Sequence, residues 1–173
     1  MDVEDKAKLA ISGDEKAFEY LMEINKEGLY RAAFAYVKNE QDALDILQET
    51  VYKAYISIDK LKEPKYFKTW LTRILINSAF NFIKKNKKIV HLTDDIANGS
   101  KSYEGNTVDE RMDILSSIKK LEDKYQTVIV LKYFQDLTIT EISEVLNCPS
   151  GTVKTHLNKA LSKLRISMGE EIF

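Results

Sequence analysis

The fold of this chain is decided by one stretch, Leu137–Arg165, which reads LTITEISEVLNCPSGTVKTHLNKALSKLR. Thr138 can cap the N-terminus of a first helix, and Glu141 three residues later completes a capping box. Asn147 stands where the chain must leave that helix, and asparagine tolerates the left-handed conformation needed there. Pro149 prevents the first helix from continuing. The stretch therefore predicts a helix-turn-helix.

The second helix of this motif combines an apolar face with an exposed polar face. Ser150 or Thr152 can cap it. The apolar residues at helical spacing are Val153, Leu157, Ala160, Leu161 and Leu164. The residues left outside are Thr152, Lys154, Thr155, Asn158, Lys159 and Lys163. Short polar side chains at the start of such a helix can contact base edges, and lysines suit phosphates. The motif therefore favours a DNA reader over its alternative, a helical hairpin with a solvated basic face.

Composition favours a helical, soluble protein without a catalytic centre. The 173 residues are 44% hydrophobic and 31% charged, with only six glycines and two prolines. We see no bilayer-spanning apolar run and no signal peptide, so we expect a cytoplasmic protein. The single Cys148 excludes an internal disulfide, and we interpret it as a small buried hydrophobe. His91 and His156 lie far apart, so we expect no metal, no cofactor and no catalytic residues.

The net charge of −1 hides alternating blocks of opposite charge. The formal charge is −5 over residues 1–60 and +7 over residues 61–88. It is −4 over residues 89–123 and +3 over residues 124–165. Two basic blocks therefore alternate with acidic ones, a pattern that suits contact with nucleic acid and with a second partner.

The rest of the chain is also predicted to be helical. Ser12 and Glu15 form another capping box, which predicts a helix from Ser12 to Val37. Further helices are predicted at Gln41–Ile58, Lys65–Lys85, Val108–Leu121 and Glu122–Phe134. Residues 89–107 are rich in Gly, Ser, Asn and Asp, which predicts a flexible linker. The predicted fold is all-α: a helical domain at 1–88, the linker at 89–107, and a helix-turn-helix domain at 108–173.

Two of these helices carry distinctive faces. In Gln41–Ile58 the expected apolar stripe is Leu44, Leu47, Val51, Tyr55 and Ile58, and the other face carries Asp42, Asp45, Gln48 and Glu49. In Lys65–Lys85 the side opposite the apolar stripe holds Lys68, Thr69, Arg73, Asn77, Phe80, Asn81 and Lys84, and it runs into the basic segment Lys84–Lys88. Cations can hold a nucleic-acid backbone, an aromatic ring can stack on a base, and amides can bond base edges. Alternatively, Phe80 packs on another helix and the lysines favour the helix C-terminus.

The chain resembles the extracytoplasmic-function (ECF) group of bacterial RNA polymerase sigma factors, members of the sigma-70 family. Three segments carry the resemblance, DALDILQETVYKAY at Asp42–Tyr55, YFKTWLTRILINSAFNFIKKNKK at Tyr66–Lys88, and the helix-turn-helix with the residues just before it. They resemble, in this order, the family's polymerase-binding helix, its helix that opens and reads the −10 promoter element, and its domain that reads the −35 element. The resemblance covers about residues 10–88 and 108–166.

The resemblance also implies roles for individual residues. The polymerase-binding face would be Asp42, Asp45, Gln48 and Glu49. The −10 surface would comprise Lys68, Arg73, Asn77, Phe80, Asn81, Lys84, Lys85, Lys87 and Lys88, with Asn77 and Asn81 where the family's recognition residues lie. The −35 surface would comprise Ser150, Gly151, Thr152, Lys154, Thr155, Asn158 and Lys159. This sequence departs from the family's commoner residues at Asn81 (Asp), Lys84 and Lys85 (Arg), Cys148 (branched aliphatic) and His156 (Arg).

The resulting hypothesis is a two-domain sigma factor, not an enzyme and without a small-molecule substrate. It would bind core RNA polymerase and promoter DNA, and direct transcription of cell-envelope or stress-response genes. The resemblance alone implies a further partner, a membrane-anchored anti-sigma factor that holds it inactive. Two alternatives remain open from the residues: a stand-alone helix-turn-helix regulator, and a protein-interaction module whose basic faces meet acidic partners.

Overall fold

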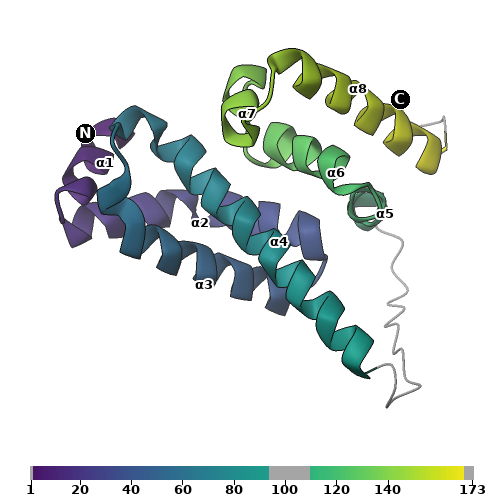
Figure 1. Cartoon of the computed structure of the whole chain (residues 1–173), viewed down its shortest axis with the longest axis horizontal. Coiled ribbons are helices and arrows are strands. Elements are labelled where there is room, and N and C mark those ends of the chain that lie inside the picture. The colour runs from purple at the N-terminus through teal and green to yellow at the C-terminus, as the bar shows by residue number, and fades with distance from the viewer. Residues whose placement is uncertain (1, 94–109, 170–173) are drawn as a thin grey trace.

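The structure, a computed structural model, describes residues 2–93 and 110–169. Within these two ranges the chain forms helices and turns and no β-strand. Figure 1 shows the helices in two groups, α1–α4 at the N-terminal end of the chain and α5–α8 at the C-terminal end. The prediction of an all-α fold with two helical parts is therefore confirmed.

The N-terminal group contains three long helices, and the first two of these begin at a side-chain cap. Its elements are α1 (Val3–Ile11), α2 (Glu15–Val37), α3 (Glu40–Ser57), single 3-10 turns at Ile58–Lys60 and Pro64–Tyr66, and α4 (Phe67–Thr93). Asp14 caps α2 by accepting a hydrogen bond from the Ala17 backbone N–H, at 2.9 Å. The predicted cap at Ser12 is wrong, because Ser12 ends α1, a helix that the sequence reading did not separate.

The C-terminal group begins with two short helices that lead into the helix-turn-helix. Its elements are α5 (Glu110–Lys119), α6 (Asp123–Ile129), a wider π-helical turn (Val130–Phe134), α7 (Ile139–Leu146) and α8 (Ser150–Ser167). The single predicted helix Glu122–Phe134 therefore changes its winding after Ile129. Such π-turns widen a helix locally and are often found near functional surfaces.

Helix α4 is longer than the sequence suggested, because it continues to Thr93 and not to Lys85. Residues 89–93, predicted as the start of the linker, are therefore helical. The rest of the predicted linker, 94–107, lies outside the described residues. In Figure 1 the far end of α4 extends away from the other helices. The basic segment Lys84–Lys88 precedes this end, and its Lys87 lines a cleft that α4 forms with α2, α3, α5 and α6.

Each group has its own hydrophobic core, and the two cores meet. The first is centred on buried residues of α2, α3 and α4, including Leu21, Leu29 and Leu75. The second is formed mainly by α6, α7 and α8. Ile76 of α4 belongs to the second core, and Val130 of the π-turn belongs to the first. The two helical groups therefore pack against one another in this structure.

Candidate nucleic-acid and partner interfaces

The turn of the helix-turn-helix has the predicted geometry. The Glu141 N–H donates to Thr138 Oγ1 at 3.2 Å, and the Thr138 N–H donates to Glu141 Oε2 at 2.7 Å. This reciprocal pair is the predicted capping box. Asn147 ends α7 in the left-handed conformation, with φ 51° and ψ 49°. The local signals in the sequence therefore fix how α8 leaves α7.

The start of α8 is free of side-chain caps, which corrects the expectation for Ser150 and Thr152. Pro149 occupies the cap position and makes no side-chain hydrogen bond, and Ser150 is already the first helical residue. The first turn also carries no acidic side chain. The positive end of the helix dipole thus lies at an exposed terminus, at Ser150 and Gly151, that no side chain caps, as an anion-binding helix terminus requires.

The predicted −35 residues form one face of α8. Val153, Ala160 and Leu164 are buried against the second core. On the other side Ser150, Gly151, Lys154, Thr155, Asn158 and Lys159 are exposed, and Thr152 is half-buried. The structure therefore brings this predicted set together as an outward polar and basic face.

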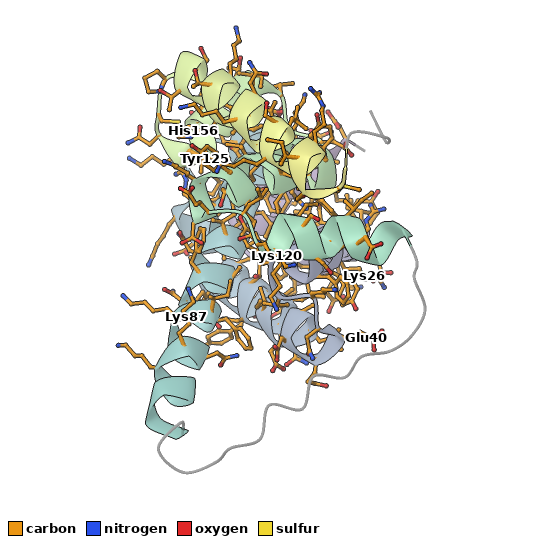
Figure 2. The ribbon with its side chains drawn as sticks, turned by 90° about the vertical axis from the view of Figure 1, so that its right-hand side faces the viewer. Lys26, Glu40, Lys87, Lys120, Tyr125 and His156 are labelled. Atoms are coloured by element: carbon orange, nitrogen blue, oxygen red, sulfur yellow. The ribbon has the colours of Figure 1, made fainter. Side chains whose placement is uncertain are left out.

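His156 and Cys148 lie apart from the exposed face of α8. The His156 ring packs edge-on against Tyr125 of α6, with ring centroids 5.8 Å apart and planes at 86° (Figure 2). Cys148 is half-buried and packs on the second core, as expected. Both residues therefore support the packing of the helix-turn-helix.

The predicted −10 residues lie along α4, and most of them are exposed. The exposed members are Lys68, Arg73, Asn77, Asn81, Lys84, Lys85, Lys87 and Lys88. Because α4 ends at Thr93, Lys84 stands more than two turns before the helix end. The attraction of a helix C-terminus for cations falls off within the last turn, so it does not account for this lysine. The basic block is better explained as a surface for an anionic partner.

Asn77 and Asn81 open onto a hollow between α3 and α4. The hollow has a volume of about 410 Å³ and is also lined by Lys53, Ile56, Ser57, Lys60 and Ile74. The hollow is therefore lined by two amides and two lysines, and by the apolar side chains of Ile56 and Ile74. The sequence indicated the two asparagines, but it did not indicate that Lys53 and Lys60 would lie beside them.

Phe80 and Arg73 differ from the rest of this set, because both are engaged by other parts of the chain. The Phe80 ring is half-buried and packs edge-on against Tyr36, at 5.5 Å between centroids and 66° between planes. This is the packing alternative that the sequence left open. Arg73 Nη2 donates to the Glu144 carbonyl of α7 at 2.7 Å, and Arg73 Nε donates to the Val145 carbonyl at 3.3 Å.

The predicted polymerase-binding residues lie along α3 but do not form one uniform face. Asp45 and Gln48 are exposed, whereas Asp42 and Glu49 are half-buried. Glu49 pairs with Lys53 at 2.5 Å, a surface pair of the kind that contributes little to stability. Asp42 lines a cleft toward the C-terminal group. Gln48 instead lines a groove on the outer face of α2 and α3.

This outer groove was missed because the expected apolar stripe of α3 holds only in part: Ile58 is buried and Leu47 and Val51 are half-buried, but Leu44 and Tyr55 are exposed. The buried positions are occupied by small residues, Ala43, Thr50 and Ala54, together with Ile46. Leu44, Tyr52 and Tyr55 are exposed at 43%, 63% and 50%. Small side chains let α3 approach α2 closely, and this turns the larger side chains outward.

The groove is apolar with an acidic rim. It has a volume of about 650 Å³ and is lined by Glu15, Phe18, Glu19, Leu47, Gln48, Val51, Tyr52 and Tyr55. The Tyr55 hydroxyl donates to Glu15 Oε1 at 3.2 Å, and the negative charge of Glu15 raises the pKa of the Tyr55 phenol. Exposed aromatic and aliphatic side chains beside carboxylates are typical of a surface that receives a basic amphipathic partner.

The described residues offer neither a metal cluster nor a membrane-spanning helix. Among them, no three His, Cys, Asp or Glu side chains gather in a way that could hold a metal ion. No described helix is both long and apolar enough to cross a membrane.

Comparisons with known proteins agree with the resemblance seen in the sequence. The family model for sigma-70 region 2 matches residues 21–89, and the model for sigma-70 region 4 matches residues 111–164. The chain is 39% identical over 148 residues to RNA polymerase sigma factor SigV of Bacillus subtilis, covering 85% of this chain and 88% of SigV. It is 35% identical over 179 residues to the ECF RNA polymerase sigma factor SigW of the same organism, covering 95% and 96%.

Solved structures show the same fold. CnrH, solved in complex with the cytosolic domain of CnrY, superposes with a TM-score of 0.76 at 23% identity, over 98% of each chain. The sigma factor RpoE, solved with the anti-sigma factor NepR from Bartonella quintana, gives 0.74 at 20% identity, over 88% of this chain and 97% of that one. The chain therefore belongs to the sigma-70 family, in its extracytoplasmic-function group, and is an initiation factor that directs RNA polymerase to promoters, not an enzyme.

Proposed function

We propose that this sigma factor divides its work among three surfaces: the outer face of α2 and α3 binds core polymerase, α4 binds the −10 element, and α8 binds the −35 element. The observation that carries the proposal is the presence of two separate basic faces, one on each helical group, together with an apolar groove with an acidic rim on α2 and α3. A stand-alone regulator would need only α7 and α8 and would leave the groove without a use.

The groove would supply the apolar area that polymerase binding buries, and the carboxylates around it would orient the polymerase by pairing with its basic side chains. Tyr52 and Tyr55 are large and exposed, and such aromatic residues dominate binding energy at interfaces. Gln48 joins the groove to the exposed Asp45. A basic helix of the polymerase could bury the aromatic side chains and pair with Asp45, while Glu49 would exchange Lys53 for a polymerase cation. Asp42, which faces the other side of α3, would contribute at the edge of this surface.

The hollow beside Asn77 and Asn81 suits an unstacked base of the −10 element. Its volume of about 410 Å³ exceeds what one base occupies, and its two amides can bond base edges. Lys68, Lys84, Lys85, Lys87 and Lys88 would hold the phosphates on either side. Phe80 packs against Tyr36 of α2 within the same helical group, so we leave its ring out of the proposed −10 surface.

The exposed face of α8 suits the major groove at the −35 element. Its uncapped N-terminus can accept a phosphate, and Lys154 and Lys159 can neutralise two more. Thr152, Thr155 and Asn158 are short enough to contact base edges. The N-terminus of α8 and its two lysines would thus position the helix, while Thr152, Thr155 and Asn158 would read the base sequence.

Regulation by a membrane-anchored anti-sigma factor is the last part of the proposal. CnrH is solved with the cytosolic domain of CnrY, and RpoE is solved with the anti-sigma factor NepR. We extend this kind of partner to the present chain, which would then be a cytoplasmic protein held at the membrane until a cell-envelope or stress signal releases it.

The test is run-off transcription with purified core polymerase on a library of promoters, with and without this protein. The proposal expects transcripts from a subset of promoters that share two elements, and only when the protein is added. Tight binding of the isolated protein to duplex DNA, with no polymerase-dependent transcripts, would instead support the stand-alone regulator.

A further inference from the structure

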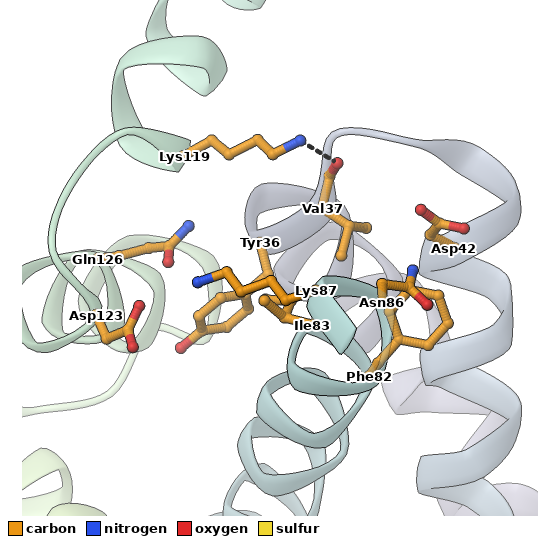
Figure 3. A pocket seen from close by; sticks show the side chains of 10 residues that line it. All are labelled: Tyr36, Val37, Asp42, Phe82, Ile83, Asn86, Lys87, Lys119, Asp123 and Gln126. Atoms are coloured by element: carbon orange, nitrogen blue, oxygen red, sulfur yellow. Dashed lines mark hydrogen bonds between the residues drawn. The ribbon is translucent and has the colours of Figure 1, made fainter. Parts of the chain in front are cut away.

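The hollow onto which the two asparagines of α4 open takes its cations from α3 and the turn after it. Lys53 of α3 and Lys60 of that turn both line the hollow. None of the lysines of α4, all of which lie in the described part of the chain, lines it. Lys87, for example, lines a separate cleft together with Asp42 and Asp123 (Figure 3). A nucleotide seated beside the asparagines would therefore meet Lys53 and Lys60 first.

The spacing of these two lysines suits the two phosphates that flank one nucleotide. Lys53 and Lys60 are seven positions apart, on a helix and the single turn that continues it. At about 1.5 Å per residue, they lie roughly 10 Å apart along the direction of α3. This is about three steps of a strand that rises about 3.4 Å per nucleotide. A lysine ammonium is a point charge on a flexible stem, so the two side chains can adapt to an unstacked strand.

The two lysines differ in their partners. Lys53 Nζ lies 2.5 Å from Glu49 Oε1, one helical turn earlier on α3, and both residues are half-buried. Lys60 is exposed and makes no ion pair with any residue that the structure describes. Glu49 is also one of the carboxylates proposed to bind polymerase. One ion pair therefore connects the polymerase surface to the hollow.

We propose that Lys53 and Lys60 are additional −10 contacts, and that Lys53 becomes available to DNA when polymerase draws Glu49 away from it. This inference rests on the proposed function, because it takes Glu49 as a polymerase contact and the hollow as part of the −10 surface. While Glu49 pairs with Lys53, it neutralises that lysine and repels an approaching phosphate. A polymerase cation on Glu49 removes both effects, whereas Lys60 can bind DNA with or without polymerase.

The size of this coupling follows from the strength of one surface ion pair. Such a pair changes an equilibrium about two- to fivefold. Because coupling between two binding sites is reciprocal, polymerase and the −10 strand should strengthen each other's binding by the same factor. Each phosphate contact on a single strand adds about 0.7 to the slope of log K against log salt. At 0.15 M salt this corresponds to roughly a fourfold change in affinity.

The test is a salt titration of the full-length protein, alone and with saturating core polymerase. The probe is a fluorescent single strand from the −10 region of a promoter that run-off transcription selects. Lys60→Ala should lower the slope by about 0.7 and the affinity about fourfold, with and without polymerase. Lys53→Ala should have this effect only with polymerase. Glu49→Gln should tighten binding by the free protein about two- to fivefold, and in that background Lys53→Ala should weaken binding without polymerase as well.

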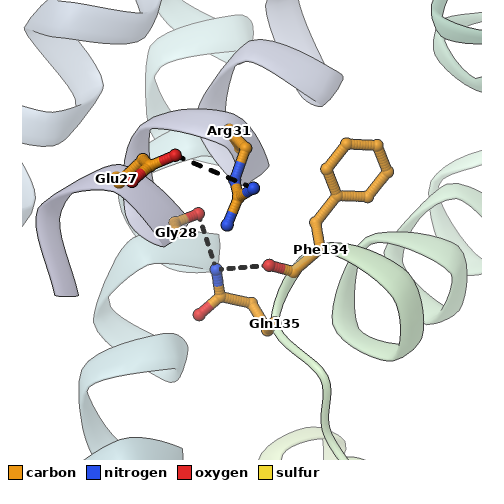
Figure 4. Close-up of polar contacts among 5 residues, drawn as sticks. All are labelled: Glu27, Gly28, Arg31, Phe134 and Gln135. Carbon is orange, nitrogen blue, oxygen red and sulfur yellow. Dashed lines mark hydrogen bonds and ion pairs between the residues drawn. The ribbon is translucent and has the colours of Figure 1, made fainter.

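The matched controls come from an ion pair of the same spacing on α2. Arg31 Nη1 lies 3.9 Å from Glu27 Oε1, and both side chains are exposed (Figure 4). Glu27→Gln and Arg31→Ala change the net charge as Glu49→Gln and Lys53→Ala do, but neither residue lines the hollow. Both control variants should bind the strand as wild type does, alone and with polymerase.

Two results would overturn the inference. One is wild-type binding by Lys53→Ala in the polymerase complex, and the other is an equal loss by that variant with and without polymerase. If Asn77→Ala with Asn81→Ala still loses binding in either case, the proposed −10 surface stands and this inference alone fails. Wild-type binding by the asparagine variant would overturn both. The replaced side chains are exposed or half-buried, so the variants should fold, which circular dichroism would check.

Discussion

Replacing Lys154 and Lys159 with alanine tests the −35 surface quantitatively. Both side chains are exposed on one face of α8, and neither has an ion pair among the described residues. If each neutralises one phosphate, the double variant should lower the slope of log K against log salt by about 1.8, since each contact releases about 0.9 counterion. At 0.15 M salt this corresponds to roughly a 30-fold loss of affinity for the upstream element.

The assay is a salt titration of the reconstituted polymerase complex on a fluorescent promoter duplex. Buried Val153, Ala160 and Leu164 are untouched, so the fold should remain intact by circular dichroism. The control replaces Lys16 and Lys120, two exposed lysines outside the three proposed surfaces, and should leave the slope unchanged. A double variant with the wild-type slope would refute the assignment of these lysines to phosphates.

Three further predictions concern polymerase binding, the helix cap and the domain interface. Asp45→Lys with Glu49→Lys should abolish co-purification with core polymerase while the melting temperature changes little, because both charges are at the surface; retained co-purification would contradict the docking assignment. Thr138→Ala should lower the free energy of unfolding by about 1 kcal/mol in urea titrations, because it removes the capping box, and an unchanged midpoint would argue against that role. The free energy of unfolding should fall as pH rises above about 10, where tyrosine ionises when unfolded, because the folded state raises the pKa of Tyr36; urea titrations should show a smaller fall in Tyr36→Phe, and an equal fall would contradict this role.

Local signals explain why the helix-turn-helix could be predicted from the sequence. The capping box of Thr138 and Glu141 and the left-handed Asn147 involve residues at most three positions apart or single residues. The side-chain chemistry of such short segments decides the backbone without help from the rest of the fold. The outward face of α8 followed, because its apolar residues recur at helical spacing.

The sequence-based predictions failed where small residues form the buried face of a helix. The expected stripe of α3 followed large side chains, yet Ala43, Thr50 and Ala54 are buried and two members of the stripe, Leu44 and Tyr55, are exposed. Helix α1 was missed for the same reason, since its buried residues are alanines. Hydrophobic periodicity weights large residues, so a helix that packs closely through small ones is assigned the wrong face.

The contacts between the two groups could not be predicted from local patterns. The pairs Tyr36 with Thr127, Gln135 with Gly28, and Arg73 with Glu144 are separated by 91, 107 and 71 positions. Their members are polar residues that look like ordinary surface or capping residues in sequence. The bonds of Arg73 to α7 therefore became visible only in the folded chain.

The central claim, that one chain holds both promoter elements through different helices, is tested most directly by crossing variants with promoters. Run-off transcription would be measured for wild type, for Asn77→Ala with Asn81→Ala, and for Lys154→Ala with Lys159→Ala. Each would be paired with promoters altered in either element. The account predicts that the α8 variant transcribes less than wild type only from promoters with an intact −35 element. It predicts that the α4 variant transcribes less than wild type only from promoters with an intact −10 element. Equal losses by both variants on every promoter would contradict it.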